Sequence, residues 1–133
     1  MNWIRVFIAG VVSGIVVWLV DFALHGLVLG STYAKYDVFH VEREPSPFTF
    51  LWIEVCLFIC VAILFAKTFS CWGGGWKGGA KFGLFFGIAI FFTGFFTPVV
   101  IKGFPYFLAW CQAGSSVIAA IVGGAVIGAL YKP

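Results

Sequence analysis

The sequence predicts an all-α protein, a bundle of four helices that each cross a lipid bilayer, and three observations lead to this fold class. Hydrophobic residues make up 62% of the chain and charged residues only 10%, whereas soluble domains usually carry about a quarter charged residues. Mean hydropathy is +1.09, and the apolar residues are gathered in four long runs. A small soluble globule cannot bury so much apolar surface, because its surface-to-volume ratio limits the buried fraction. Lipid is therefore expected to cover the rest.

Each run is long enough to cross a membrane, because the hydrocarbon core is about 30 Å thick and needs about 20 apolar residues in helical form. The runs extend over residues 3–29, 48–69, 79–101 and 105–131, within a single membrane domain that covers residues 1–133. They are continuously apolar rather than alternating, which excludes the pattern of a transmembrane β-barrel.

Proline and glycine mark the connections between the runs. The first connection is a polar outer loop, residues 31–47, which ends in Glu-Pro-Ser-Pro. Each proline disfavours helix in the residue before it, whereas Pro47 suits the first turn of the next helix. The second connection is glycine-rich, residues 71–79, and the third is a short turn around Gly103.

Asp21 is the most informative residue, because an acid in a transmembrane helix costs free energy and usually faces the bundle or a wet cavity. On a helical wheel Asp21 shares one face with Gly10, Gly14 and His25. The two glycines allow another backbone to approach closely. That face is therefore expected to be buried in protein.

Polar residues of other runs lie at a similar depth in the outer half of the membrane. Glu54 is about seven residues into the second run, which at about 1.5 Å per residue places it near the depth of Asp21. We therefore predict a polar cluster that opens toward the outside, in which the carboxyl groups of Asp21 and Glu54 face each other or a shared cation. Its predicted members are Asp21, His25, Glu54 and Gln112, with Arg43 or Lys102 as counter-charges.

Several roles of this cluster remain open at this level. The side chains can simply satisfy one another and fix the register of the helices. Asp, Glu and His are also the usual groups of an ion or proton pathway, and ligand binding is a further alternative. A metal site at Asp21, His25 and Glu54 is a weaker alternative, because Cys56 and Cys60 point to the opposite side of their helix.

The sequence contains no complete cofactor or catalytic motif. Only one histidine, His25, lies within a run, so a haem with two histidine ligands is not expected. The glycine-rich connection lacks the Gly-Lys-Ser/Thr of a phosphate loop, and the four cysteines are expected to be free thiols. The net charge of +3 is spread over loop ends, which excludes a nucleic-acid partner. We therefore expect no cofactor, no metal and no catalytic residues.

Small residues recur at every fourth position in the last two runs, a spacing that allows close helix contact. The two series are Gly79, Gly83 and Gly87 in the third run and Ala120, Gly124 and Gly128 in the fourth. Packing within one bundle is favoured over packing against another chain. Together with Gly10 and Gly14, the glycines of these series are the predicted helix-packing residues.

Parts of the chain resemble a group of small four-helix bacterial membrane proteins of unknown function. The motifs that carry this resemblance are Trp18-Leu-Val-Asp21-Phe-Ala-Leu-His25-Gly-Leu-Val-Leu, then Tyr33 and Tyr36, and the glycine-rich turn with Lys77 and Gly83. Because that group has no assigned activity, the resemblance implies the bacterial inner membrane as a location and adds no chemistry.

The sequence favours a non-catalytic accessory or structural subunit that packs against a larger membrane complex. The polar residues stop about halfway across the membrane, whereas a pathway needs polar groups at successive depths. The glycine series and the phenylalanine-rich third run offer packing surfaces, so the expected partners are lipid, other membrane-protein subunits or a second copy. The alternative is a small homo-oligomeric channel or transporter for an ion or small solute, and a membrane enzyme is the third interpretation.

Basic residues predict the orientation. Five of them lie on one side and three on the other: Arg5, Lys67, Lys77, Lys81 and Lys132 against Lys35, Arg43 and Lys102. By the positive-inside rule both termini should be cytoplasmic. Reporter fusions at Met1 and Pro133 test this orientation, and a periplasmic signal from either fusion would contradict it.

Overall fold

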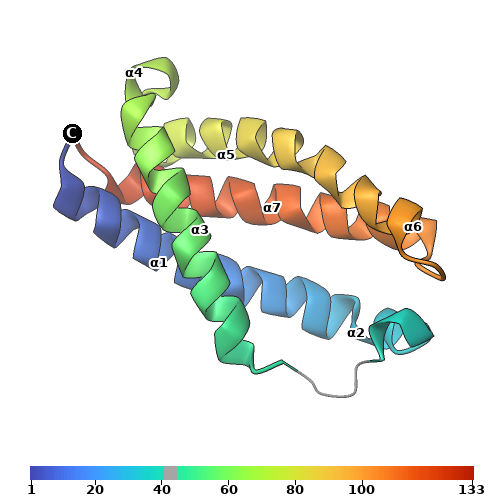
Figure 1. The fold of residues 1–133 in the computed structure, drawn as a ribbon. Helices are drawn as coiled ribbons and strands as arrows, with labels where there is room; N and C mark the ends of the chain where they lie inside the picture. Colours follow the sequence, from blue (N-terminus) through green and yellow to red (C-terminus); the bar gives the residue numbers. More distant parts are fainter. Residues whose placement is uncertain (41–44) are drawn as a thin grey trace.

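The computed structural model describes residues 1–40 and 45–133, and in these residues the chain is all helical, which confirms the predicted fold class (Figure 1). Four helical spans are long and apolar enough to cross a membrane, as expected of a multi-pass membrane protein. The spans cover Trp3–Val28, Pro47–Lys67, Gly75–Val100 and Tyr106–Leu130.

Two of the spans are composite. The first is α1, Trp3–Asp21, continued by the π-helical segment η1, Phe22–Val28. The third is α5, Gly75–Phe91, continued by the 3₁₀ segment η3, Phe92–Phe95, and by α6, Phe96–Val100. The second and fourth are α3, Pro47–Lys67, and α7, Tyr106–Leu130. The short helices between spans are α2, Gly30–Tyr33, η2, Asp37–Phe39, and α4, Phe69–Trp72.

The helix ends differ from the sequence prediction at two connections. The third span begins at Gly75 rather than Gly79, because the positive φ angles of Gly73 and Gly75, 75° and 76°, complete the turn before Gly78. The predicted outer loop contains two short helices in its described residues, α2 and η2. At the end of that loop Ser46 caps α3 through its side chain and Pro47 occupies the first turn, as predicted.

The helices pack as two pairs, α5 with α7 and α1 with α3, and the pairs meet mainly where α1 contacts α7. α5 lies along α7, α1 packs against both α3 and α7, and α3 contacts α7 only slightly (Figure 1). We call the end where the two termini lie the terminal end, and the end with α2 and α6 the distal end. The terminal end is closed by aromatic packing, in which the ring of Phe65 contacts Phe82 and Tyr131 edge-on.

Glycines set the spacing of α5 and α7. A Cβ atom on Gly79 would collide with the backbone of Gly124 and Gly128, and one on Gly83 would collide with the backbone of Ala120. A Cβ on Gly87 would lie 3.0 Å from the Cα atom of Val117. The two small-residue series therefore face each other inside this chain.

The crossing of α1 over α3 also depends on glycine. A Cβ atom on Gly10 would lie 2.6 Å from the Cα atom of Ile59, and one on Gly14 would lie 2.6 Å from that of Val55. α1 is further tied to α7 because the buried Ser13 hydroxyl donates a hydrogen bond of 2.9 Å to the carbonyl oxygen of Gly123.

Replacing Gly79 by leucine should lower the free energy of unfolding by roughly 1–3 kcal/mol, because the new side chain must separate two backbones in contact. Gly114→Leu is the matched control, since nothing lies within 4 Å of a Cβ atom at Gly114. Thermal unfolding in detergent micelles measures both. Equal midpoints for the two variants would contradict the packing described here.

Candidate functional site

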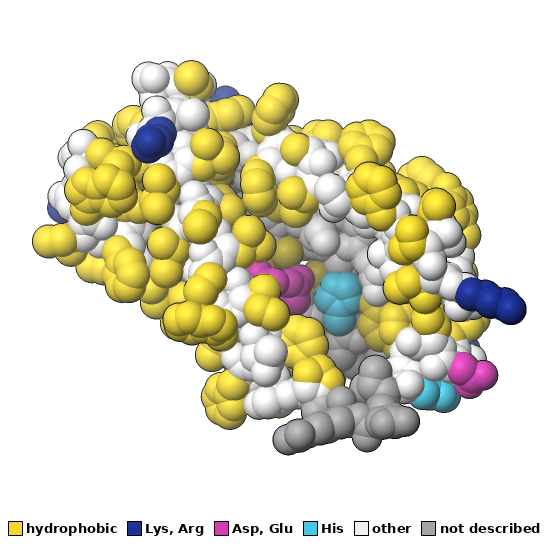
Figure 2. All heavy atoms as spheres, in the orientation of Figure 1, with side chains coloured by type: hydrophobic (Ala, Val, Ile, Leu, Met, Phe, Trp, Pro, Cys, Tyr) yellow, Lys and Arg dark blue, Asp and Glu magenta, His cyan; other side chains and the backbone are white. Residues whose placement is uncertain are grey.

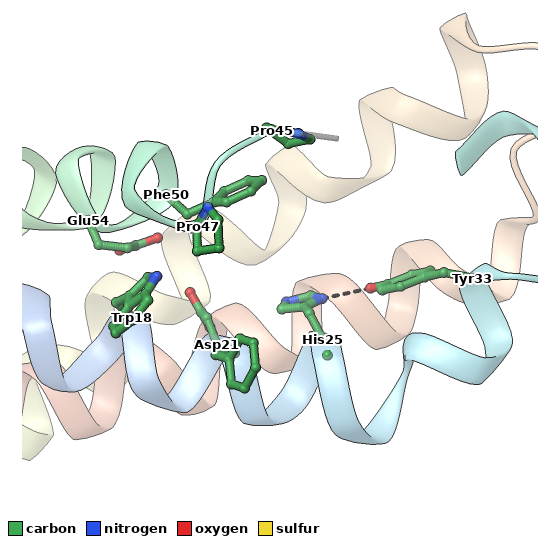
Figure 3. Close-up of a pocket in the computed structure, with 10 residues that line it drawn as sticks. Trp18, Asp21, His25, Tyr33, Pro45, Pro47, Phe50 and Glu54 are labelled. Atoms are coloured by element: carbon green, nitrogen blue, oxygen red, sulfur yellow. Dashed lines mark hydrogen bonds between the residues drawn. The ribbon is translucent and has the colours of Figure 1, made fainter. Parts of the chain in front are cut away.

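A cavity of about 680 Å³ lies between the first span and the beginning of α3 (Figure 3). This volume is within the range of about 300–1,000 Å³ that small-molecule sites occupy. Its polar lining comes from Asp21, His25, Tyr33 and Glu54, and its aromatic lining includes Trp18, Phe22 and Phe50.

The π-helical segment η1 shapes one wall of this cavity. Its hydrogen bonds skip one residue more than those of an α-helix, as in the 3.0 Å bond from the amide of Leu29 to the carbonyl of Leu24. The wider turn changes the direction in which the side chains after Asp21 project. Segments of this kind are often found at functional sites. Here η1 carries His25, whose side chain lies between Asp21 and Tyr33 along the cavity (Figure 3).

Asp21 and Glu54 approach each other from two helices. Asp21 ends α1, Glu54 lies in the third turn of α3, and their carboxyl groups point toward one another (Figure 3). They are close enough to interact electrostatically. Both also line a second cavity of about 70 Å³ among α1, α3, α5 and α7. The two acids therefore lie between the larger cavity and the smaller one inside the bundle.

The acid pair has no lysine or arginine beside it in the part of the chain that the structure describes, since neither residue type occurs among the described residues that line the two cavities. His25 lies close enough to Asp21 to interact with it electrostatically. One oxygen of Asp21, Oδ1, is buried, and the described residues offer it no hydrogen-bond partner. Among the described residues, the one acid–base contact short enough for an ion pair joins His40 to Asp37 at 3.4 Å, on the exposed surface. The cavity is therefore acidic.

Tyr33 connects the cavity to α7. Its hydroxyl oxygen lies 2.6 Å from Nδ1 of His25 and accepts a hydrogen bond of 3.4 Å from Nε2 of Gln112. The Tyr33 hydroxyl therefore joins His25 of the first span to Gln112 of α7. Burial raises the pKa of the Tyr33 phenol above its ordinary value of 10.0, although the hydrogen bond from Gln112 opposes the shift. The Tyr33 phenol is therefore neutral at physiological pH.

Aromatic contacts hold Tyr33 at the distal end. Its ring stacks on that of His25 with centroids 6.0 Å apart and an interplanar angle of 8°. Phe39 packs against Tyr33 at 4.7 Å and against Phe104 at 5.4 Å. These contacts hold Tyr33 at one end of the cavity.

The structure brings together part of the predicted cluster. Asp21, His25 and Glu54 line one cavity, whereas Gln112 reaches this group only through Tyr33. Lys102 is exposed in the turn after α6 and lines neither cavity, so it is not placed as a counter-charge. Arg43 lies outside the described residues.

Trp18 and Tyr33 are among the lining residues that the predicted cluster did not include. Trp18 lies three residues before Asp21, and this helical spacing was the available signal for a shared face. Tyr33 lies beyond the first span, where no periodicity applies.

Within residues 1–40 and 45–133, no three His, Cys, Asp or Glu side chains are close enough to hold one metal ion. All four cysteines are free: Cys56, Cys60 and Cys71 are exposed and Cys111 is partly buried.

No family model, curated protein or solved structure matches this chain. The resemblance to small four-helix bacterial membrane proteins therefore stays an expectation. A function is therefore inferred from the geometry of the cavity.

Tyr33→Phe should lower the free energy of unfolding by about 0.5–1.5 kcal/mol, because it removes the hydroxyl that links His25 to Gln112. Tyr36→Phe is the matched control, since the Tyr36 ring packs on Phe107 at 6.1 Å and the described residues make no hydrogen bond to its hydroxyl.

The effect should depend on pH in a defined direction. The folded chain holds the Tyr33 proton to higher pH than the unfolded chain, so this contribution is complete below about pH 10 and is lost as the pH rises further. Denaturant unfolding of the wild type and both variants at neutral and alkaline pH measures this difference. A pH-independent gap between the wild type and Tyr33→Phe would contradict the raised pKa of the buried Tyr33 phenol.

Proposed function

We propose that this multi-pass membrane protein binds a cationic solute in the cavity between α1 and α3, as the solute-binding unit of a small transporter. The observation that carries the proposal is the pair of carboxyl groups, Asp21 and Glu54, that face one cavity without a lysine or arginine among its described lining residues. An unpaired acid at membrane depth is unfavourable. A bound cation would offset that cost.

A purely structural role for the acids fits the geometry less well. Buried polar groups that only fix helix register are expected to satisfy one another through hydrogen bonds. Oδ1 of Asp21 has no such partner in the described residues, and the Asp21 residue lines a cavity of about 680 Å³. Both features favour a site that receives a ligand.

The packing at the terminal end favours a binding site over a continuous channel. Beyond Asp21, the first span is closed against its neighbours by Val17, Ser13 and Val6, which are at most 1% exposed. A conducting pathway needs polar groups at successive depths, and here Ser13 is engaged with Gly123. The cavity therefore suits a solute that enters from the distal side and is held about halfway across.

An accessory subunit is the second candidate, and one observation favours it. Phe85, Phe92 and Phe96 of the third span are 68%, 68% and 70% exposed, and they offer a bulky surface to lipid, another subunit or a second copy. The glycine series no longer supports this candidate, because it is engaged between α5 and α7.

We place the protein in the bacterial inner membrane with both termini cytoplasmic, which turns the cavity toward the outer side.

Cations should stabilise the folded protein through the acid pair. We expect at least one of sodium, magnesium, methylammonium and tetraphenylphosphonium, compared at one ionic strength, to raise the thermal unfolding midpoint of the purified protein. A ligand at a hundred times its dissociation constant adds about 2.7 kcal/mol. The gain should disappear in Asp21→Asn and in Glu54→Gln.

Asp37→Asn is the matched control, because Asp37 is an exposed acid outside the cavity. It should keep the full cation effect. If no cation stabilises the wild type beyond an ionic-strength effect, or if the gain survives in both cavity variants, the proposed function is wrong.

A further inference from the structure

We propose that the solute is a hydrophobic organic cation, with one positive charge on a body large enough to fill the aromatic part of the cavity. This inference rests on the proposed function, since it names the class of cation that the acid pair would hold. Three features of the cavity support it: its depth, its opening and the chemistry of its walls.

The acids lie well inside the apolar part of the molecule. Glu54 is seven residues after Pro47, where α3 begins, and Asp21 is seven residues before Val28, where the first span ends. At about 1.5 Å per residue both acids lie roughly 10 Å from the distal helix ends. Half of a hydrocarbon core is about 15 Å, so a ligand at the acid pair lies at the depth of lipid chains.

The cavity is open on the side where α3 leaves the rest of the bundle. Its lining residues come from the first span, from Tyr33 and from the segment between Pro45 and Glu54, and none comes from α5, α6 or α7. α3 makes only slight contact with α7. Figure 2 shows the result as a hollow in the surface, with acidic and histidine side chains inside it and hydrophobic side chains around it. A ligand in this hollow stays in contact with lipid and needs apolar surface of its own.

The walls suit an organic cation better than a bare ion. Trp18 and Phe22 lie side by side with ring centroids 6.5 Å apart, and Phe50 lines the cavity from α3 (Figure 3). Aromatic faces attract organic cations, most strongly where water is excluded. The described residues also lack a group of three ligands for a metal ion, and one small ion would leave most of the volume empty.

His25 does not oppose this assignment. Its Nδ1 atom is engaged with the Tyr33 hydroxyl at 2.6 Å. The cavity presents two carboxyl groups and neither a lysine nor an arginine among its described lining residues.

The test is equilibrium binding of radiolabelled tetraphenylphosphonium to the protein in lipid nanodiscs, with empty nanodiscs subtracted. Two competitors separate charge from apolar surface. Tetramethylammonium has the same charge with little apolar surface, and tetraphenylborate has the same shape with a negative charge. We expect saturable binding at least about tenfold tighter than that of tetramethylammonium, with no competition by tetraphenylborate.

A cavity-filling variant tests the location without removing an acid. The atoms nearest to a Cβ atom on Gly26 belong to the Phe22 ring, at an ordinary 3.7 Å, so Gly26→Leu should fold and reduce the affinity at least about tenfold. Gly114→Leu, on the open side of α7, should bind like the wild type. Unfolding midpoints check that both variants are folded.

The outcomes separate this inference from the proposed function. If tetramethylammonium or an inorganic cation binds as tightly as tetraphenylphosphonium in an Asp21-dependent manner, the organic-cation class is wrong and the proposed function stands. If no cation binds above empty nanodiscs, both are wrong. Tetraphenylphosphonium binding that is unchanged in Gly26→Leu and Asp21→Asn would also overturn the inference, because the ligand would then lie elsewhere.

Discussion

The approach of Asp21 to Glu54 is the contact on which the distal half of the molecule depends. A carboxyl group at this depth is unfavourable unless a polar group lies beside it. The crossing of α1 over α3 brings the two carboxyl groups together. That crossing requires Gly14, since a Cβ atom there would lie 2.9 Å from the carbonyl oxygen of Glu54. A larger residue would push α3 away and separate the two acids. Gly14, about two helical turns before Asp21, therefore determines the position of Glu54.

The helices are closely packed toward the terminal end of the bundle and separated by a cavity toward the distal end. Toward the terminal end, glycine contacts and the aromatic packing around Phe65 exclude space between the helices. Toward the distal end, α3 leaves the bundle and η1 widens the first span, and the cavity lies between them. A rigid, closed half that supports an open, polar half is an arrangement suited to holding a ligand at a fixed depth.

Sequence reasoning succeeded where a single physical requirement dominated. Bilayer thickness fixes the length of a span, so the four runs identified the four helices. The unfavourable energy of buried acids identified Asp21 and Glu54 as candidates for one site. It failed where local sequence does not decide: glycines before Gly79 fit both a turn and a helix, and the π-helical turn after Asp21 has no local signature. Tyr33 was missed because it acts through a tertiary contact with Gln112.

Cation protection of the two carboxyl groups tests the central claim most directly. The wild-type protein in nanodiscs is treated with dicyclohexylcarbodiimide, which modifies carboxyl groups in apolar surroundings, and the labelled peptides are identified by mass spectrometry. Asp21 or Glu54 should be modified, and a bound cation should suppress that modification, while any labelling of the exposed Asp37 should not respond. Labelling of both cavity acids that no cation changes would contradict a shared cation-binding site.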